Sequence, residues 1–169
     1  VHKAVVKSLG KALIPNPSKL NYIVKDTDLL LFNPIVELNY SNALNFNDIH
    51  LFELAGEREN IYFDPSDTKI GIVSCGGLCP GINDVIRSIV MTAHYNYDIK
   101  EIFGFRFGYM GMTKNPPDNP LMLTPESVKD IHEEGGSILG SSRGLQNTNE
   151  IIDVLVSYGI NILFTIGGD

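Results

Sequence analysis

The feature that most constrains the fold is a run of β-forming residues that leads directly into two glycines and an aspartate. Residues 160–166 form this run, and the sequence Gly-Gly-Asp follows at 167–169. Residues 70–74 form a similar run, which leads into a glycine-rich loop at 76–81. Glycines let the backbone approach a polyphosphate closely, and an aspartate offers the hard oxygen ligand that Mg²⁺ prefers. The two segments predict a kinase-like nucleotide or phosphate site, in a chain that we expect to be part of a longer protein.

Composition excludes several classes of protein. The chain has 169 residues, of which 43% are hydrophobic and 20% charged, as expected for a globular polypeptide of about one domain. Its net charge of -7 argues against a nucleic-acid partner, because no basic stripe is present to neutralise phosphates. A phosphorylated small molecule needs only a local positive pocket. No apolar stretch approaches the roughly 20 residues of a membrane span, and the start of the chain does not resemble a signal peptide.

Cys75 and Cys79 are too few and too close together for a disulfide framework or a zinc site with four ligands. We therefore expect two small reduced side chains beside the glycine-rich loop. This pattern indicates a reducing compartment.

Residues 1–66 differ from the rest of the chain. The stretch 20–60 holds seven asparagines and short apolar runs without a sustained helical or strand period. We interpret it as an N-terminal extension that wraps the core, with short strands near 22–24 and 29–32. A partly disordered linker is the alternative, because Asn and Pro disfavour regular elements.

Residues 67–169 show alternating strand and helix patterns. Strands are predicted at 70–74 and 101–105, since both are short apolar runs of the kind that a parallel sheet buries. An amphipathic helix is predicted between them, from apolar residues with helical spacing at Ile82, Val85, Ile86, Ile89, Val90 and Ala93.

The pattern continues to the end of the chain. Thr124-Pro125-Glu126 favours a helix start, and that helix is expected to end at 135–136. A short third strand is predicted at 137–139, a helix at 149–158 and a final strand at 160–166. This order predicts an α/β fold with a doubly wound, mostly parallel sheet, whose ligands bind beyond the carboxyl ends of the strands.

Several residues at that edge are candidate ligands of phosphate or metal. The loop 76–81 opens a helix whose first N–H groups suit phosphate oxygens, although a simple tight turn would look the same. Its glycine spacing is not that of the dinucleotide fingerprint, and it lacks the Lys-Ser/Thr ending of a Walker loop. Arg143 offers a bidentate guanidinium within the small-residue loop 140–144, unless it is a solvated surface arginine. Arg106 follows the second strand and either contacts a nucleotide or has a packing role. Asp169 is either a metal ligand or the cap of a following helix.

Four segments resemble the phosphofructokinase family, in order and without large gaps between about residues 57 and 169. They are Gly76-Gly77-x-x-Pro80-Gly81-x-Asn83-x-x-Ile86-Arg87, Gly104-Phe105-Arg106-Phe107-Gly108-Tyr109-Met110-Gly111, Asp130-Ile131-His132-x-x-Gly135-Gly136-Ser137-Ile138-Leu139-Gly140-Ser141-Ser142-Arg143-Gly144 and Ile166-Gly167-Gly168-Asp169. The extension ending at 55–65 and the pair Leu78-Cys79 are similar to the branch of ATP-dependent trypanosomatid and plant-like enzymes.

The resemblance implies Mg²⁺-dependent phosphoryl transfer from ATP or pyrophosphate to the 1-hydroxyl of fructose 6-phosphate. Gly77 would lie against the donor phosphates, and Arg143 with Gly144 beside the nucleotide. Asp169 would bind Mg²⁺ with Gly168 behind it, and Arg106 would be a secondary donor contact. Such transfer needs positioning and charge neutralisation more than covalent chemistry.

The sequence also departs from the family pattern. The family's catalytic base and its sugar-phosphate residues belong to later motifs that these residues do not include, so a donor half-site without a catalytic residue is expected. The residue that distinguishes ATP from pyrophosphate follows the Gly-Gly-Asp motif and is absent. We favour ATP, because Arg143-Gly144 resembles the ATP-dependent branch, and keep a pyrophosphate-dependent enzyme as the alternative.

Other classes are weaker interpretations. A lipid or nicotinamide-nucleotide kinase would lack the upstream Gly-Gly-x-x-Pro-Gly loop, and an NADP-binding oxidoreductase would need another glycine spacing. A non-catalytic regulatory or sugar-phosphate-sensing subunit of the same fold stays open. The resemblance further implies an allosteric, glycolytic enzyme, a tetramer or dimer, in the cytoplasm or, for a trypanosomatid source, in the glycosome.

Overall fold

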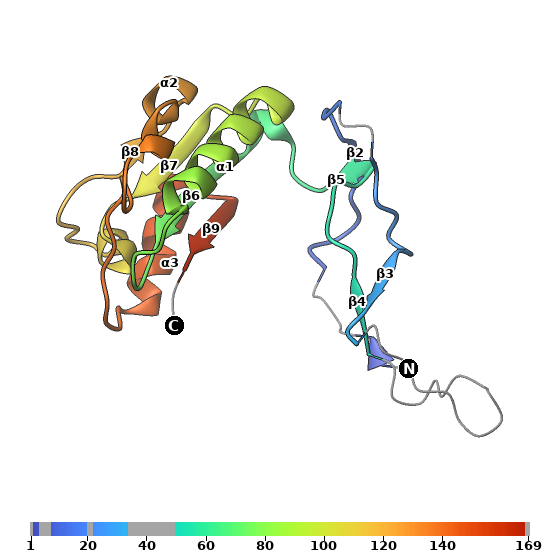
Figure 1. Ribbon diagram of the computed structural model, residues 1–169, viewed down its shortest axis with the longest axis horizontal. Helices are drawn as coiled ribbons and strands as arrows, with labels where there is room; N and C mark the ends of the chain where they lie inside the picture. Colours follow the sequence, from blue (N-terminus) through green and yellow to red (C-terminus); the bar gives the residue numbers. More distant parts are fainter. Residues whose placement is uncertain (1, 4–7, 20–21, 34–49, 168–169) are drawn as a thin grey trace. The chain divides into compact units, whose positions relative to one another are not determined.

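The computed structural model describes residues 2–3, 8–19, 22–33 and 50–167 (Figure 1). The chain divides into two compact units, Val1–Tyr62 and Phe63–Asp169. The expectation that the first segment wraps the core stays a prediction.

The first unit consists of short strands. They are β1 (His2–Lys3), β2 (Ile14–Pro15), β3 (Leu29–Leu31), β4 (His50–Glu53) and β5 (Asn60–Ile61). One sheet has the order β1-β4-β3, and β2 pairs with β5 in an antiparallel ribbon. The strand predicted at 29–32 is confirmed as β3, but the one predicted at 22–24 is wrong. Val24 is buried there, and its N–H donates to the Glu57 carbonyl oxygen at 2.8 Å without a strand ladder around it.

The second unit is built on a sheet with the order β8-β7-β6-β9. Its strands are β6 (Lys69–Ser74), β7 (Glu101–Phe105), β8 (Leu121–Met122) and β9 (Ile162–Ile166). Strand β6 runs parallel to both β7 and β9, whereas β8 is antiparallel to β7. The predictions of an α/β fold and of a mostly parallel sheet are confirmed, and the sheet is mixed because of β8, which the sequence patterns did not predict.

The helical elements of this unit complete the fold. They are η1 (Pro65–Asp67), α1 (Ile82–Tyr97), η2 (Gly108–Met112), α2 (Pro125–Val128), η3 (Ile131–Glu133) and α3 (Thr148–Tyr158). Neighbouring residues of a strand point to opposite faces of the sheet. Accordingly, buried Ile72 packs with residues of α1, and buried Val73 packs with residues of α3. The sheet therefore has a helix on each face (Figure 1).

The connection before α3 corrects two predictions. The helix expected to reach 135–136 ends at Val128, although its start is confirmed by a capping box between Thr124 and Ser127. Val128 and Ile131 are both buried, and beyond the C-cap Lys129 the chain forms a short 3₁₀ turn that begins at Ile131.

The strand expected at 137–139 is also wrong. The Gly140 N–H donates to the Ser137 carbonyl oxygen at 2.9 Å, which closes a turn. The Ile138 N–H donates to the Asn83 side chain at 2.9 Å instead of to a neighbouring strand. Local turn formation and one side-chain acceptor thus replace a strand ladder. The final strand begins at Ile162, two residues later than predicted, and Asn161 caps its start by hydrogen bonds to the backbone of Lys69.

Candidate functional site

Loops from three parts of the second unit meet beyond the carboxyl ends of the parallel strands. The loop after β6 and the segment 137–144 are joined by hydrogen bonds in both directions. The Gly76 N–H donates to the Ser142 carbonyl oxygen at 3.3 Å, and the Ser141 hydroxyl donates to the Gly76 carbonyl oxygen at 2.9 Å. The two loops therefore form one hydrogen-bonded framework.

Ser74, the last residue of β6, supports this framework from the sheet. Its side chain is fully buried, and its hydroxyl donates to the Gly140 carbonyl oxygen at 2.6 Å. The same hydroxyl lies 2.8 Å from the Ser137 hydroxyl. Sequence reasoning missed this residue, and the available signal was a hydroxyl at the end of an otherwise apolar strand.

Asn83 of α1 holds the same segment from the helix side. This buried side chain donates to the Glu134 carbonyl oxygen at 3.1 Å and accepts from the Ile138 N–H at 2.9 Å. A buried amide with both ends satisfied fixes its neighbours in one arrangement. Asn83 thus connects the first turn of α1 to the loop that carries Arg143.

The loop after β7 packs on the segment 137–144. The Phe107 N–H donates to the Leu139 carbonyl oxygen at 2.7 Å. Gly108 has a left-handed φ of 60°, and a Cβ at this position would lie 2.8 Å from the Ser142 hydroxyl oxygen. Only a glycine allows this approach of the two backbones.

The structure brings two of the predicted site residues together. A Cβ at Gly77 would lie 3.6 Å from Nη2 of Arg143, and both residues are exposed. Neighbouring Gly144 has a φ of 102°, and no atom lies within 4 Å of the position that its Cβ would take. With the other described residues, the Arg143 guanidinium forms no hydrogen bond or ion pair. A cation and an open glycine backbone therefore face the same space.

The loop that holds Gly77 leads into the N-terminus of α1. Its N-cap is Gly81, with a φ of 89° and no side chain to cap the helix, and the first hydrogen bond of the helix runs from Val85 to Gly81. The N–H groups of the first turn therefore have no partner within the helix. Together with the positive end of the helix dipole, they favour an anion such as phosphate.

The end of β9 lies beside the same loop. The Cys75 N–H donates to the Ile166 carbonyl oxygen at 2.9 Å. Gly167 has a φ of 75°, and its Cβ would lie 2.8 Å from the Cys75 carbonyl oxygen. Gly168 and Asp169, which the sequence predicts as nucleotide and metal ligands, lie outside the described residues.

Magnesium at such a site needs little from the protein. Mg²⁺ is usually bound through one or two carboxylates together with substrate phosphates. Within the described ranges, no group of three or more His, Cys, Asp or Glu side chains converges. Asp169, the carboxylate that the sequence predicts as the Mg²⁺ ligand, lies outside the described residues, so this role stays a prediction.

Arg106 is engaged within its own loop. Its Nη1 lies 2.6 Å from Oδ2 of Asp118, and its Cζ lies 4.9 Å from the centre of the Phe107 ring. These contacts support the packing role that the sequence left open beside a nucleotide contact.

The two cysteines are free, as predicted, and differ in their surroundings. Cys75 is buried and Cys79 is exposed. Burial raises the pKa of the Cys75 thiol above its ordinary value, against a smaller opposite effect of hydrogen bonding with Tyr109. Burial also raises the pKa of Tyr109, and the neighbouring Cys75 adds to that shift. Both groups stay protonated at neutral pH.

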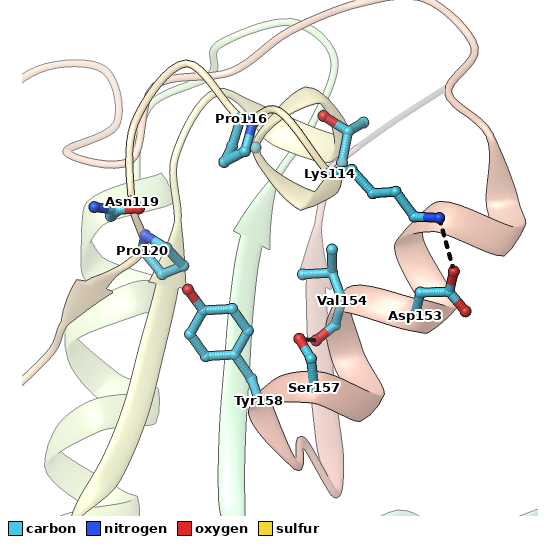
Figure 2. A pocket seen from close by; sticks show the side chains of 10 residues that line it. Lys114, Pro116, Asn119, Pro120, Asp153, Val154, Ser157 and Tyr158 are labelled. Atoms are coloured by element: carbon cyan, nitrogen blue, oxygen red, sulfur yellow. Dashed lines mark hydrogen bonds and ion pairs between the residues drawn. The ribbon is translucent and has the colours of Figure 1, made fainter.

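A pocket of about 420 Å³ lies apart from these residues, between the loop 111–120 and α3. Figure 2 shows the Lys114 side chain reaching towards Asp153, with Nζ 3.4 Å from Oδ2, and the Tyr158 hydroxyl directed towards Pro120. None of the predicted site residues lines this pocket.

The sequence is similar to the sequences of several known proteins. The ATP-dependent 6-phosphofructokinase of Trypanosoma brucei brucei is 46% identical over 171 residues, which cover 97% of this chain and 35% of that protein. The enzyme of the same name from Trypanosoma cruzi is 54% identical over 119 residues, or 70% of this chain and 24% of that protein. ATP-dependent 6-phosphofructokinase 1 of Arabidopsis thaliana is 47% identical over 118 residues, with 70% and 24% covered. The chain thus spans about a third or less of these relatives.

Solved structures agree on the fold. The Pichia pastoris phosphofructokinase in the T-state matches with a TM-score of 0.54 and 20% identity, over 72% of this chain and 14% of that one. The pyrophosphate-dependent phosphofructokinase of Marinobacter aquaeolei matches with a TM-score of 0.51 and 21% identity, over 60% of this chain and 26% of that one. Among the described residues, no helix has the length and apolar character to span a membrane. The family pattern described as Phosphofructokinase matches residues 69–169, well over half of the sequence, and the chain belongs to the phosphofructokinase family.

Proposed function

We propose that the protein carrying these residues is an ATP-dependent 6-phosphofructokinase, which transfers a phosphoryl group from ATP to the 1-hydroxyl of fructose 6-phosphate with Mg²⁺. The observation that carries the proposal is the approach of Arg143 to Gly77, in the loop that leads into the uncapped first turn of α1. A guanidinium and aligned N–H groups neutralise the charge that phosphoryl transfer spreads over the phosphate oxygens. The relatives are called ATP-dependent 6-phosphofructokinases, and these names support fructose 6-phosphate as the acceptor and ATP rather than pyrophosphate as the donor.

Each predicted site residue has a role in this proposal. Gly77 lies against the donor phosphates because any side chain there would compete for their space. Arg143 bridges phosphate oxygens, and Gly144 leaves room beside it for the nucleotide. Asp169 supplies the carboxylate for Mg²⁺, with Gly168 giving the backbone access to the phosphates. The catalytic base is not among these residues.

The test is an assay of fructose 1,6-bisphosphate formation by the protein expressed from its complete coding sequence. Fructose 6-phosphate and Mg²⁺ are supplied with either ATP or pyrophosphate. Turnover with ATP alone is the expected result. Turnover with pyrophosphate alone would keep the fold and the acceptor but reverse the donor. No turnover with either donor would favour a non-catalytic member of the family, and nucleotide binding without turnover would identify a sensing subunit.

A further inference from the structure

Arg106 and Asp118 form an ion pair beside the proposed donor site. Arg106 follows β7 directly, and Asp118 lies in the connection from η2 to β8. Nη1 of Arg106 lies 2.6 Å from Oδ2 of Asp118, and the two side chains are 34% and 46% exposed. The pair is therefore partly shielded from solvent, so its charge-assisted hydrogen bond is worth more than that of a fully exposed pair.

The backbone around Arg106 is folded tightly on itself. A Cβ at Gly111 would lie 1.8 Å from the Arg106 carbonyl oxygen, so the chain turns back on Arg106 through η2. The Arg106 guanidinium then reaches the far end of this connection at Asp118 and also covers the Phe107 ring. One side chain thus joins the start and the end of the loop after β7.

Phe107 connects the loop after β7 with the segment that carries Arg143. It has a φ of 58°, a conformation that a bulky residue adopts only when its surroundings impose it. Its N–H donates to the Leu139 carbonyl oxygen at 2.7 Å. A Cβ at Gly140 would lie 3.0 Å from Cδ1 of Phe107, so the ring lies directly against the backbone of Gly140.

Gly140 begins the short segment that carries Arg143. Its carbonyl oxygen is held by the Ser74 hydroxyl at 2.6 Å, while Phe107 packs on its α-carbon. The segment is therefore held by β6 through Ser74 and by the loop after β7 through Phe107. Arg143 makes no hydrogen bond or ion pair with other described residues, so its position depends on this backbone support.

We propose that the Arg106–Asp118 pair is a positioning device for Arg143. It holds Phe107 against Gly140 and so keeps the Arg143 guanidinium opposite Gly77. Arg106 then acts on the donor through Phe107 and the segment 139–144, without touching the donor. This inference rests on the proposed function for its kinetic readout, and a second readout is independent of activity.

The kinetic test uses Arg106→Gln, Asp118→Asn and the double variant in the protein from the complete coding sequence. Each single variant is expected to raise the KM for ATP about threefold to tenfold, the scale of about one net hydrogen bond. The KM for fructose 6-phosphate should stay within about twofold, and the double variant should be no worse than either single one, because both changes remove the same contact. Asp118→Glu keeps the charge and should restore most of the ATP affinity.

A direct donor contact by Arg106 gives a different pattern. Asp118→Asn would then release Arg106 towards the phosphates, and the KM for ATP would fall or stay unchanged, which would overturn the proposal. Glu126→Gln is the matched control, because it breaks the exposed Lys129–Glu126 pair on α2, away from the loops. This variant should leave both KM values unchanged.

Hydrogen–deuterium exchange of the same variants gives the independent readout. Arg106→Gln and Asp118→Asn are expected to increase deuterium uptake in peptides covering 105–109 and 139–144, and Glu126→Gln should not. Unchanged uptake at 139–144 would contradict the proposal, as would increased uptake with an unchanged KM for ATP. If the wild-type protein shows no turnover with ATP or pyrophosphate, the proposed function fails, while exchange still shows whether the pair supports the segment.

Discussion

Arg143 and Gly77 face each other from two separate loops, with Nη2 of the arginine 3.6 Å from the position of a Cβ on the glycine. The two residues approach each other because their loops are hydrogen-bonded together, by the Gly76 N–H to the Ser142 carbonyl oxygen and by the Ser141 hydroxyl to the Gly76 carbonyl oxygen. The relationship between this cation and this glycine is the basis of the proposed donor site.

Substitutions at Gly77 should lower the affinity for ATP without lowering the stability of the fold. Gly77→Ala places its methyl group at ordinary contact distance from Arg143, and both this variant and Gly77→Val should fold, since Gly77 is exposed and has no left-handed φ. Gly77→Val should displace the guanidinium and raise the KM for ATP by at least about fivefold, on the scale of about one net hydrogen bond. Kinetics and a thermal melt measure the two effects.

Gly135 provides the control for this series. No atom lies within 4 Å of the position of its Cβ, and its φ is not left-handed. Gly135→Val should therefore change neither the melting temperature nor the KM for ATP. An equal loss of ATP affinity in Gly77→Val and Gly135→Val would show that the loss does not depend on the approach of Gly77 to Arg143.

Gly108→Ala tests the contact between the loop after β7 and Ser142. Its Cβ would lie 2.8 Å from the Ser142 hydroxyl oxygen and 3.0 Å from the Ser142 nitrogen, at a φ of 60°. Strain and overlap together should cost about 3 kcal/mol in the free energy of unfolding, measured by urea denaturation.

Gly159→Ala is the matched variant for backbone strain. Gly159 has a similar φ of 69°, but its Cβ would lie 3.7 Å from the nearest atom, Cδ of Lys69. Its cost should be about 1 kcal/mol from strain alone. Equal costs at the two positions would mean that the loops do not meet as closely as the structure places them.

Ser74→Ala removes the buried hydroxyl that supports Gly140 and Ser137. The loss leaves both groups without this partner and should cost about 1–3 kcal/mol of stability. Ser157→Ala is the control, because the hydroxyl of the exposed Ser157 donates to the Val154 carbonyl oxygen of the same helix, α3. Denaturation curves should show a change of less than about 0.5 kcal/mol for this variant.

The cysteines should react at different rates. Iodoacetamide is expected to label exposed Cys79 rapidly at pH 8 and buried Cys75 slowly, because burial raises the pKa of Cys75 and lowers its thiolate fraction. Peptide mass spectrometry measures the two rates. Faster labelling of Cys75 than of Cys79 in the folded protein would contradict the burial of the loop after β6.

The same shift predicts a loss of stability at high pH. The folded state holds the Cys75 proton more tightly than the unfolded state, whose thiol has the ordinary pKa of 9.0. The stabilising contribution is therefore complete below pH 9.0 and is lost as the pH rises through the higher folded-state pKa. Cys75→Ser should reduce this pH dependence in melts between pH 8 and about 11, whereas Cys79→Ser should not.

Strong local patterns made part of the fold predictable from sequence. The apolar runs of β6 and β7, the stripe of α1 and the glycine stop of α3 each carry a local signal, and the structure places these elements close to the predicted ranges. The short antiparallel β8 has no such signal, because two residues cannot show a period.

The two wrong strand predictions have a common physical cause. At 137–139 and 22–24 the sequence looks apolar and β-forming, but the backbone partners there are supplied by residues far along the chain, namely Asn83 and Glu57. The glycines and Arg143 mark a candidate site in the sequence, and their role in binding the donor stays a prediction. The hydrogen bonds of Ser74 and Asn83 and the Arg106–Asp118 ion pair could not be predicted from the sequence, because they form only when the loops meet in the folded protein.

The most direct test of the account is the affinity of Arg143→Gln for its donor, measured with the protein from the complete coding sequence. The account predicts a rise of at least about tenfold in the KM for ATP, since a bidentate charged contact is lost, with the KM for fructose 6-phosphate within about twofold. Arg143→Lys should recover only part of the affinity, because a point charge replaces a planar fork. An unchanged KM for ATP in a folded Arg143→Gln protein would contradict the assignment of the donor site to Gly77 and Arg143.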